Sequence, residues 1–247
     1  MHKISIGGEA VFRVFGLTVT NSLLLTFVML VIFFTVGFTY DLRLKGLGTY
    51  STQIPGNFVF FIRFVSHSLY SLFESVLGEK TKVFYSILAS FFLFILLSNW
   101  LGLIPGVGSI LYGHEEKVPL LRAGTADLNT TIGLALIAFV IIQYFGIKYV
   151  GLSSYLNKFI NLKNPMSFFT GILELISEFS KIISFAFRLF GNIFAGEVLL
   201  VIIATLIPVA VSLPFLLLEL FVGAVQALVF SLLTAVFLNM AITKEAH

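Results

Sequence analysis

The sequence contains no cysteine among its 247 residues, so disulfide bonds and thiolate metal sites are excluded. It also lacks the GxxxxGK[ST] loop that cradles nucleotide phosphates, so we expect no bond chemistry on a nucleotide in this chain. Its four histidines lie far apart, and no two of them have the spacing of paired ligands on one helix. We therefore expect no cofactor and no bound metal.

Charged residues are scarce as well, at 11% of the chain against about 25% in a typical soluble protein. So few charges cannot cover the surface of a soluble domain of this size. Hydrophobic residues make up 58% of the chain, including 29 Phe, and the mean hydropathy is +1.05. The composition predicts an all-α polytopic membrane protein, with residues 1–247 forming a single membrane domain in the lipid bilayer.

Apolar runs of about 20 residues, the length needed to cross a bilayer, mark the expected transmembrane helices. Three ordinary spans are predicted at 17–38, 84–104 and 128–147. Two longer helices follow at 167–207 and 215–243, and the short connection between them is bracketed by prolines. We therefore expect about five transmembrane helices, the last two forming a hairpin.

One further segment, 57–80, has apolar residues at helical spacing and polar residues such as Arg63 and Glu74 on another face. This pattern predicts an interfacial helix that lies on the membrane, and a short re-entrant segment is the alternative.

The Lys and Arg residues of the loops predict the orientation, because cytoplasmic loops carry an excess of positive charge. With the amino end outside, four Lys or Arg residues, Arg122 among them, fall in outer segments and nine in inner segments. We expect the amino end outside and the carboxyl end in the cytoplasm. The Lys and Arg residues of the loops account for the net charge of +3. We therefore expect no nucleic-acid partner.

The two last helices are longer than a bilayer is thick. A continuous helix over 167–207 would measure about 60 Å, whereas the hydrocarbon core is about 30 Å thick. A break in the helix near Gly191 or Gly196 would let two shorter helices fit the bilayer. We expect instead that both helices are strongly tilted, so that they form a slanted surface against a cylindrical partner.

Several polar residues fall inside these long helices, where each charge is costly. On a helical wheel, five of them lie within about 40° of Arg188 and form a polar stripe: Glu174, Ser177, Lys181, Ser184 and Asn192. Glu197 lies on the opposite face, about 180° away, while Glu219 and Gln226 share a face of the last helix.

This arrangement predicts two aqueous regions that do not meet. The inner region follows the stripe from Glu174 toward Ser184, and the outer region contains Glu197 and Glu219. Arg188 would separate them as a fixed positive charge, because Arg does not lose its proton in proteins. Structural alternatives stay open. Arg188 could pair with a Glu on a neighbouring helix, and the polar amides could join helices. Glu174, Glu178 and Lys181 could snorkel to headgroups, and Glu197 and Glu219 could form structural hydrogen bonds as protonated acids.

The segment around Arg188 reads FRLFGNIFAGE at 187–197, and the last helix contains VQALVFSLLTAVFLNMA at 225–241. Both resemble signature segments of subunit a of F-type ATP synthases. Shorter matches, in chain order, lie at 20–24, 92–106 and 125–136, so the resemblance covers nearly the whole chain.

The resemblance implies a stator subunit that provides two offset half-channels for protons and couples their flow to ATP synthesis. Arg188 would face the carboxylates of a rotating c-ring, and Asn192, Glu197, Glu219 and Gln226 would line the outer half-channel and rotor interface. Glu174 and Ser177 match positions of the inner half-channel. Peripheral-stalk b subunits are further implied partners, and ATP would be made by other subunits. The implied location is the plasma membrane of a bacterium, with an organelle membrane as the alternative.

The sequence departs from the family at one pair of positions. Many members have one His and one Glu where this chain has Glu197 and Glu219. Two close carboxylates would share a proton, which suits a relay, but they would also suit a cation such as sodium. A secondary transporter is a rival class, although the paired repeats typical of transporters are not found. A purely structural subunit is the other rival.

Overall fold

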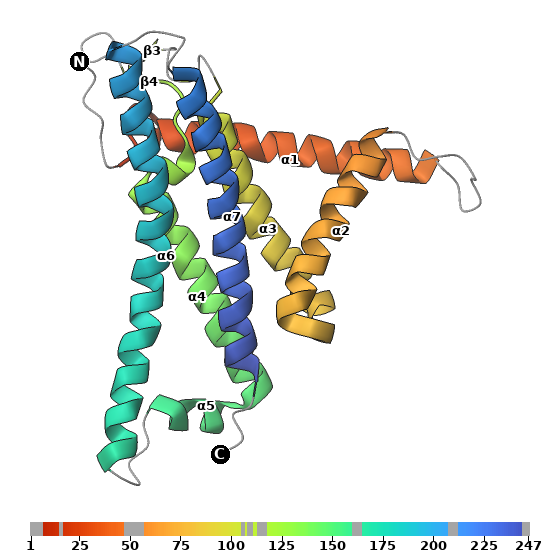
Figure 1. Cartoon of the computed structure of the whole chain (residues 1–247), viewed down its shortest axis with the longest axis vertical. Helices are drawn as coiled ribbons and strands as arrows, with labels where there is room; N and C mark the ends of the chain where they lie inside the picture. Colours follow the sequence, from red (N-terminus) through yellow and green to blue (C-terminus); the bar gives the residue numbers. More distant parts are fainter. Residues whose placement is uncertain are drawn as a thin grey trace.

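The computed structural model describes residues 7–14, 17–46, 57–104, 107, 111–112, 118–159, 165–206 and 212–243. Helices dominate these residues (Figure 1). Five helical stretches among them are long and apolar enough to cross a membrane. The all-α polytopic membrane class predicted from the composition is confirmed.

The two longest helices are α6, Pro165–Leu206, and α7, Ser212–Ile242. They lie side by side and run in opposite directions (Figure 1). At 42 residues, α6 is about 63 Å long, and it continues without a break through Gly191 and Gly196. The alternative of a broken helix is therefore wrong. Proline opens α6 and lies in the first turn of α7, where its missing N–H costs no helical hydrogen bond.

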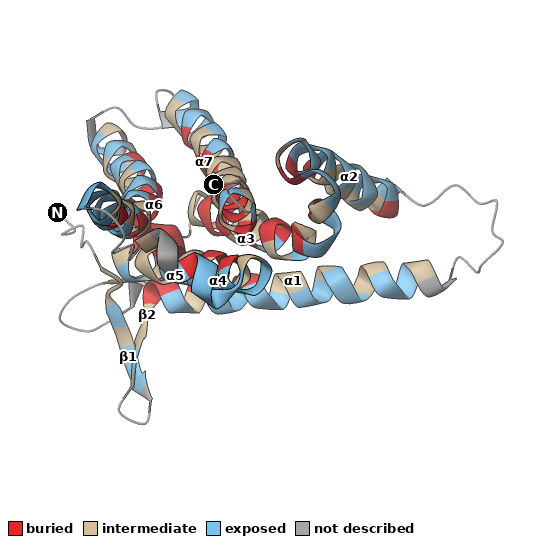
Figure 2. Ribbon diagram, turned by 90° about the horizontal axis from the view of Figure 1, so that it is seen from below, coloured by how far each residue is buried: buried red, intermediate tan, exposed pale blue. Residues whose placement is uncertain are grey.

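Helices α3, Thr81–Gly102, and α4, Leu128–Val150, pack against this pair and complete the core. Their buried side chains meet those of α6 and α7 in one apolar cluster, in which Phe91, Leu134, Leu189 and Phe230 are all less than a tenth exposed. Figure 2 shows buried residues concentrated where these helices meet, whereas α1 is mostly exposed. The core therefore fixes the relative positions of α4, α6 and α7.

The first helix, α1, spans Asn21–Gly46, runs crosswise to α6 and α7 (Figure 1) and packs against α3. The expected span 17–38 began too early, because Leu17–Thr20 forms strand β2 and pairs with β1, Ala10–Val14. The Thr20 hydroxyl accepts a hydrogen bond from the Leu23 N–H at 3.3 Å. It thereby caps the helix start and explains why the helix begins after it.

The segment expected at 57–80 forms helix α2, Asn57–Leu77, followed by a 3-10 turn, η1, at Gly78–Lys80. It packs against α3 and α7. Its placement in the membrane interface stays a prediction. A short helix that we did not predict, α5 at Leu152–Phe159, lies beneath α4 and the start of α6.

The loop between α3 and α4 contains two short strands and a 3-10 turn: β3 at Leu111–Tyr112, β4 at Val118–Pro119 and η3 at Gly124–Ala126. The start of α4 is joined to α1, because the Ser22 hydroxyl donates to Asp127 Oδ2 at 2.7 Å. Asp127 also caps α4 by accepting from the Asn129 N–H at 3.0 Å. These contacts join the loop to α1, and its η3 turn packs against α6.

Candidate functional site

Arg188 lies near the middle of α6, and its side chain is exposed on the outer surface of the helix bundle. Its Nη2 donates to the Ser184 hydroxyl one turn away, at 3.1 Å. Its neighbour in the sequence, Phe187, is exposed as well. Among the residues that the structure describes, no carboxylate forms an ion pair with Arg188. The guanidinium is therefore presented outward from the polar stripe of α6, whereas most other exposed residues of this helix are large and apolar.

Asn192 connects the Arg188 face of α6 to α7. Its Nδ2 donates to Gln226 Oε1 at 2.8 Å. Asn192 is exposed, whereas Gln226 is buried between the helices. The contact joins two of the predicted site residues one turn from Arg188, and it fixes the register of α6 against α7 at this level.

Glu219 on α7 is buried directly beneath Gly196 of α6. Its side chain is 7% exposed, and its Oε1 has no hydrogen-bond partner among the described residues. A Cβ atom placed on Gly196 would lie 2.0 Å from the carboxyl atoms of Glu219. A larger residue at this position would require the carboxyl group to shift, so Gly196 leaves the space that Glu219 occupies.

Glu197, the neighbour of Gly196, is paired with Arg122 from the loop before α4. Arg122 Nη2 lies 2.9 Å from Glu197 Oε2, and its Nε donates to both carboxylate oxygens at 3.1 and 3.2 Å. Arg122 Nη1 donates to the Gly7 carbonyl at 3.1 Å, and the Arg122 side chain is 5% exposed. We expected Glu197 and Glu219 to share a proton, but this bidentate pair gives Glu197 a permanent cationic partner.

The residues predicted for the inner region lie on the half of α6 that precedes Arg188. Ser177 and Ser184 are exposed, and Glu174 is half-buried. Lys181 instead turns toward the bundle, where its Nζ lies 2.6 Å from Glu178 Oε1. Glu178 itself is 5% exposed. The alternative that this pair snorkels to headgroups is therefore wrong for Glu178.

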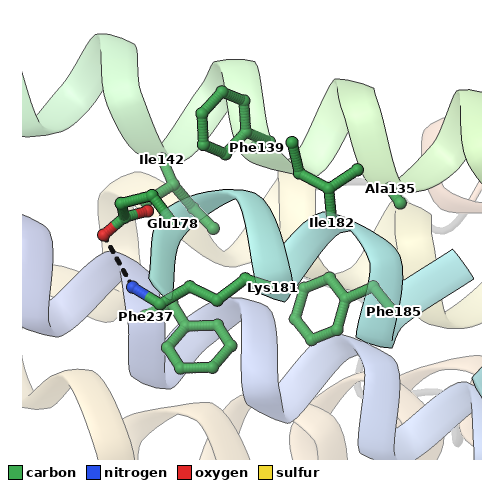
Figure 3. A pocket seen from close by; sticks show the side chains of 8 residues that line it. All are labelled: Ala135, Phe139, Ile142, Glu178, Lys181, Ile182, Phe185 and Phe237. Atoms are coloured by element: carbon green, nitrogen blue, oxygen red, sulfur yellow. Dashed lines mark hydrogen bonds and ion pairs between the residues drawn. The ribbon is translucent and has the colours of Figure 1, made fainter. Parts of the chain in front are cut away.

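A small cavity beside this ion pair is otherwise lined by apolar side chains of α4, α6 and α7 (Figure 3). Beyond the cavity, Gln143 Nε2 on α4 donates to Glu178 Oε2 at 2.9 Å. The Tyr155 hydroxyl on α5 donates to Gln143 Oε1 at 2.5 Å. Burial, helped by the negative charges of Glu178 and Glu174, raises the pKa of Tyr155 to about 12, so this hydroxyl keeps its proton.

The sequence did not reveal Arg122, Gln143 or Tyr155 as parts of the site. Arg122 counted only as a loop charge, and Gln143 lies alone in an apolar run. Gln143 lies 35 positions from its partner Glu178, and Arg122 lies 75 positions from Glu197. Tyr155 lies 12 positions from Gln143. No local spacing could have shown these contacts. A single amide inside a membrane span does, however, indicate a hydrogen bond to another helix, and Gln143 could have been singled out on that ground.

Residues 20–239 match the protein family described as ATP synthase A chain. The chain is 34% identical to the ATP synthase subunit a of Mycobacterium bovis, over 98% of this chain and 95% of that protein. It is 34% identical to the ATP synthase subunit a of Mycobacterium leprae, over 99% of this chain and 96% of the relative. The ATP synthase subunit a of Sulfurihydrogenibium is 33% identical over 79% of this chain and 86% of its own length.

Proposed function

We propose that this chain, which belongs to the ATP synthase A chain family, is the stator subunit that passes protons to and from a rotating c-ring. It is a multi-pass integral membrane protein and a component of the ATP synthase complex. Within that complex it would provide two half-channels, one from each side of the membrane, and couple proton flow to the synthesis of ATP by other subunits.

The exposed guanidinium of Arg188 is the observation that carries this proposal. A charge on an apolar membrane surface is costly unless it has a partner, and no carboxylate of the described residues supplies one. A ring of rotor carboxylates passing this surface would supply that partner in turn. Because Arg stays charged, it would attract each ionised carboxylate, favour release of its proton and block direct leakage between the half-channels.

The outer half-channel would use Glu219 as the group that carries the proton. A buried carboxyl oxygen without a hydrogen-bond partner is costly as an anion, so Glu219 is suited to hold a proton. Glu197 is suited to stay ionised instead, because Arg122 neutralises it. The Asn192–Gln226 contact lies between Glu219 and the level of Arg188 and would line the transfer to the rotor.

The inner half-channel would follow the polar side of α6 from Glu174 past Ser177 to Ser184. Ser184 contacts Arg188 directly, so a proton leaving a rotor carboxylate at Arg188 meets this hydroxyl first. The two half-channels then reach α6 from opposite ends and approach it at different faces. A proton can pass from one to the other only by travelling with the rotor, which couples flow to rotation.

The helices would lie in the membrane with α6 and α7 steeply tilted, because α6 is about twice as long as the bilayer core is thick. The same slant would lay the Arg188 face along the side of a cylindrical ring. Peripheral-stalk b subunits would hold the chain against rotation. We place it in the plasma membrane of a bacterium, with the amino end outside and the carboxyl end in the cytoplasm.

Substitution of Arg188 in the intact ATP synthase tests the proposal. Arg188→Ala and Arg188→Lys should both abolish proton-driven ATP synthesis in sealed vesicles while the complex assembles normally, since Lys is a compact ammonium without the guanidinium fork and shifts its pKa readily when buried. Arg63→Ala removes an exposed arginine on α2 and is the control. A structural subunit would tolerate the Arg188 variants, so normal synthesis in either one refutes the assignment.

Transport measurements in the same vesicles test two alternative functions, a sodium-driven subunit and a secondary transporter. Paired acids could serve sodium, in which case synthesis would follow a sodium gradient at constant pH. The proton version requires synthesis driven by a pH difference in the absence of sodium. A secondary transporter would move its ion without the rest of the synthase, so ion uptake by the isolated subunit would favour that class.

A further inference from the structure

A buried carboxylate, Glu178, lies at the centre of a polar cluster that joins α4, α5 and α6. Its Oε1 accepts a hydrogen bond from Lys181 Nζ at 2.6 Å, and its Oε2 accepts one from Gln143 Nε2 at 2.9 Å. Both oxygens therefore have donors from the chain itself, and the side chain is only 7% exposed. A carboxylate that is satisfied in this way is suited to be a fixed charge rather than a proton relay.

The orientation of the Gln143 amide is set from the other side of the cluster. The Tyr155 hydroxyl donates to the Gln143 carbonyl oxygen at 2.5 Å, which directs the NH2 group of Gln143 toward Glu178. Gly146 makes this possible, because a Cβ atom there would lie 2.7 Å from the Tyr155 ring. Helix α5 thus holds the carboxylate in place through α4.

Lys181 has two partners that draw it into the bundle. Besides its contact with Glu178, its Nζ lies 4.8 Å from the centre of the Phe237 ring on α7. Figure 3 shows the Lys181 side chain extending between the Glu178 carboxylate and this ring, next to the small cavity. Only 19% of the Lys181 side chain is exposed. By sequence position, however, Lys181 belongs to the same polar stripe as Arg188, two turns away.

We infer that Glu178 is a positioning residue that pulls Lys181 inward and neutralises it, so that Arg188 is the single uncompensated cation of the α6 stripe. This inference rests on the proposed function. Two turns of helix separate the two cations by about 10 Å. An uncompensated ammonium at that distance, at the permittivity typical of a protein, would slow proton passage along the inner half-channel roughly tenfold.

Passive proton flow through the membrane sector, measured in vesicles from which the catalytic sector has been removed, tests this role. Glu178→Gln keeps the size of the side chain and removes its charge, and we expect flow to fall about tenfold, equivalent to about 1.4 kcal/mol. The double variant Glu178→Gln, Lys181→Gln removes both charges and should restore flow to within about twofold. Glu74→Gln, which removes an exposed carboxylate on α2, is the control.

Rescue separates charge compensation from the alternatives. If Glu178 were a proton relay or only a packing element, the double variant would remain as slow as the single one, and that result overturns the inference. Unchanged flow in Glu178→Gln overturns it as well. The Arg188 variants judge the proposed function separately, because they act on coupling and leave the Glu178–Lys181 pair intact.

A second measurement uses the unmodified complex and does not depend on whether the variants assemble. Amine acetylation followed by mass spectrometry should leave Lys181 protected while it modifies Lys82, which is exposed at the start of α3. Equal modification of the two lysines would show that Lys181 is not held inside the bundle, and the inference would fail.

Discussion

The fit of Gly196 over Glu219 leads to the sharpest prediction for the outer half-channel. In Gly196→Ala, the new Cβ atom would lie 2.0 Å from the carboxyl group, whereas ordinary contact begins at 3.4 Å. The Glu219 carboxyl group, which ends a flexible but buried side chain, must therefore move by about 1.4 Å. Overpacking of this kind costs about 1–3 kcal/mol.

If that cost falls on the position from which Glu219 passes its proton, the rate of proton flow should fall by about 5- to 150-fold. The assay is proton-driven ATP synthesis in vesicles, with the amount of assembled complex measured in parallel. Gly191→Ala is the matched control, since it lies in the same helix and a Cβ there meets nothing within 4 Å. Both variants gain the same helix propensity, about 1 kcal/mol, so the difference between them reports the clash alone. Equal rates in the two variants would refute the argument.

Three other perturbations have clear expected outcomes. Arg122→Gln removes the cationic partner of Glu197, and it should slow proton flow at least tenfold by leaving a half-buried carboxylate without its guanidinium; wild-type flow would remove Arg122 from the path. Glu219→Gln should lower proton flow more than it lowers assembly, and an unchanged flow rate would exclude Glu219 as the proton carrier. The raised pKa of Tyr155 means that docking of α5 is at full strength below pH about 10 and is lost as the pH rises toward about 12. Tyrosinate absorbance of the wild type and Tyr155→Phe should therefore coincide up to pH about 11, and an extra step near pH 10 in the wild type would contradict the buried hydrogen bond to Gln143.

Most of the fold could be predicted from the sequence because the bilayer imposes simple rules on it. A span must be long, apolar and helical, so the core of every predicted span lies within a helix of the structure. The errors fall at the ends and in short elements. Strand pairing with β1 takes residues 17–20 away from α1, and α5 has eight residues, too few to give a clear periodic pattern.

The candidate site could be predicted only in part. The stripe on α6 follows from helix geometry, and the structure places Ser184 beside Arg188 as that geometry requires. Contacts between helices do not follow from one sequence. The partners of Glu197 and Glu178 come from a loop and from α4, and they decide which of the acidic residues are neutralised. A helical wheel shows which residues share a face, but it does not show what that face meets.

The hydrogen bond from Arg122 to the Gly7 carbonyl connects the amino-terminal segment to the acidic residues of α6. The Ser22–Asp127 contact joins the start of α1 to the loop that carries Arg122. The described residues 7–14 and 17–22 are therefore held to residues 118–129 despite their separation in the sequence. Chimeras built from two relatives would keep their activity only when both segments come from the same parent. An affinity tag fused upstream of Gly7 would exert its strain on the segment that holds Arg122, next to the proposed outer half-channel.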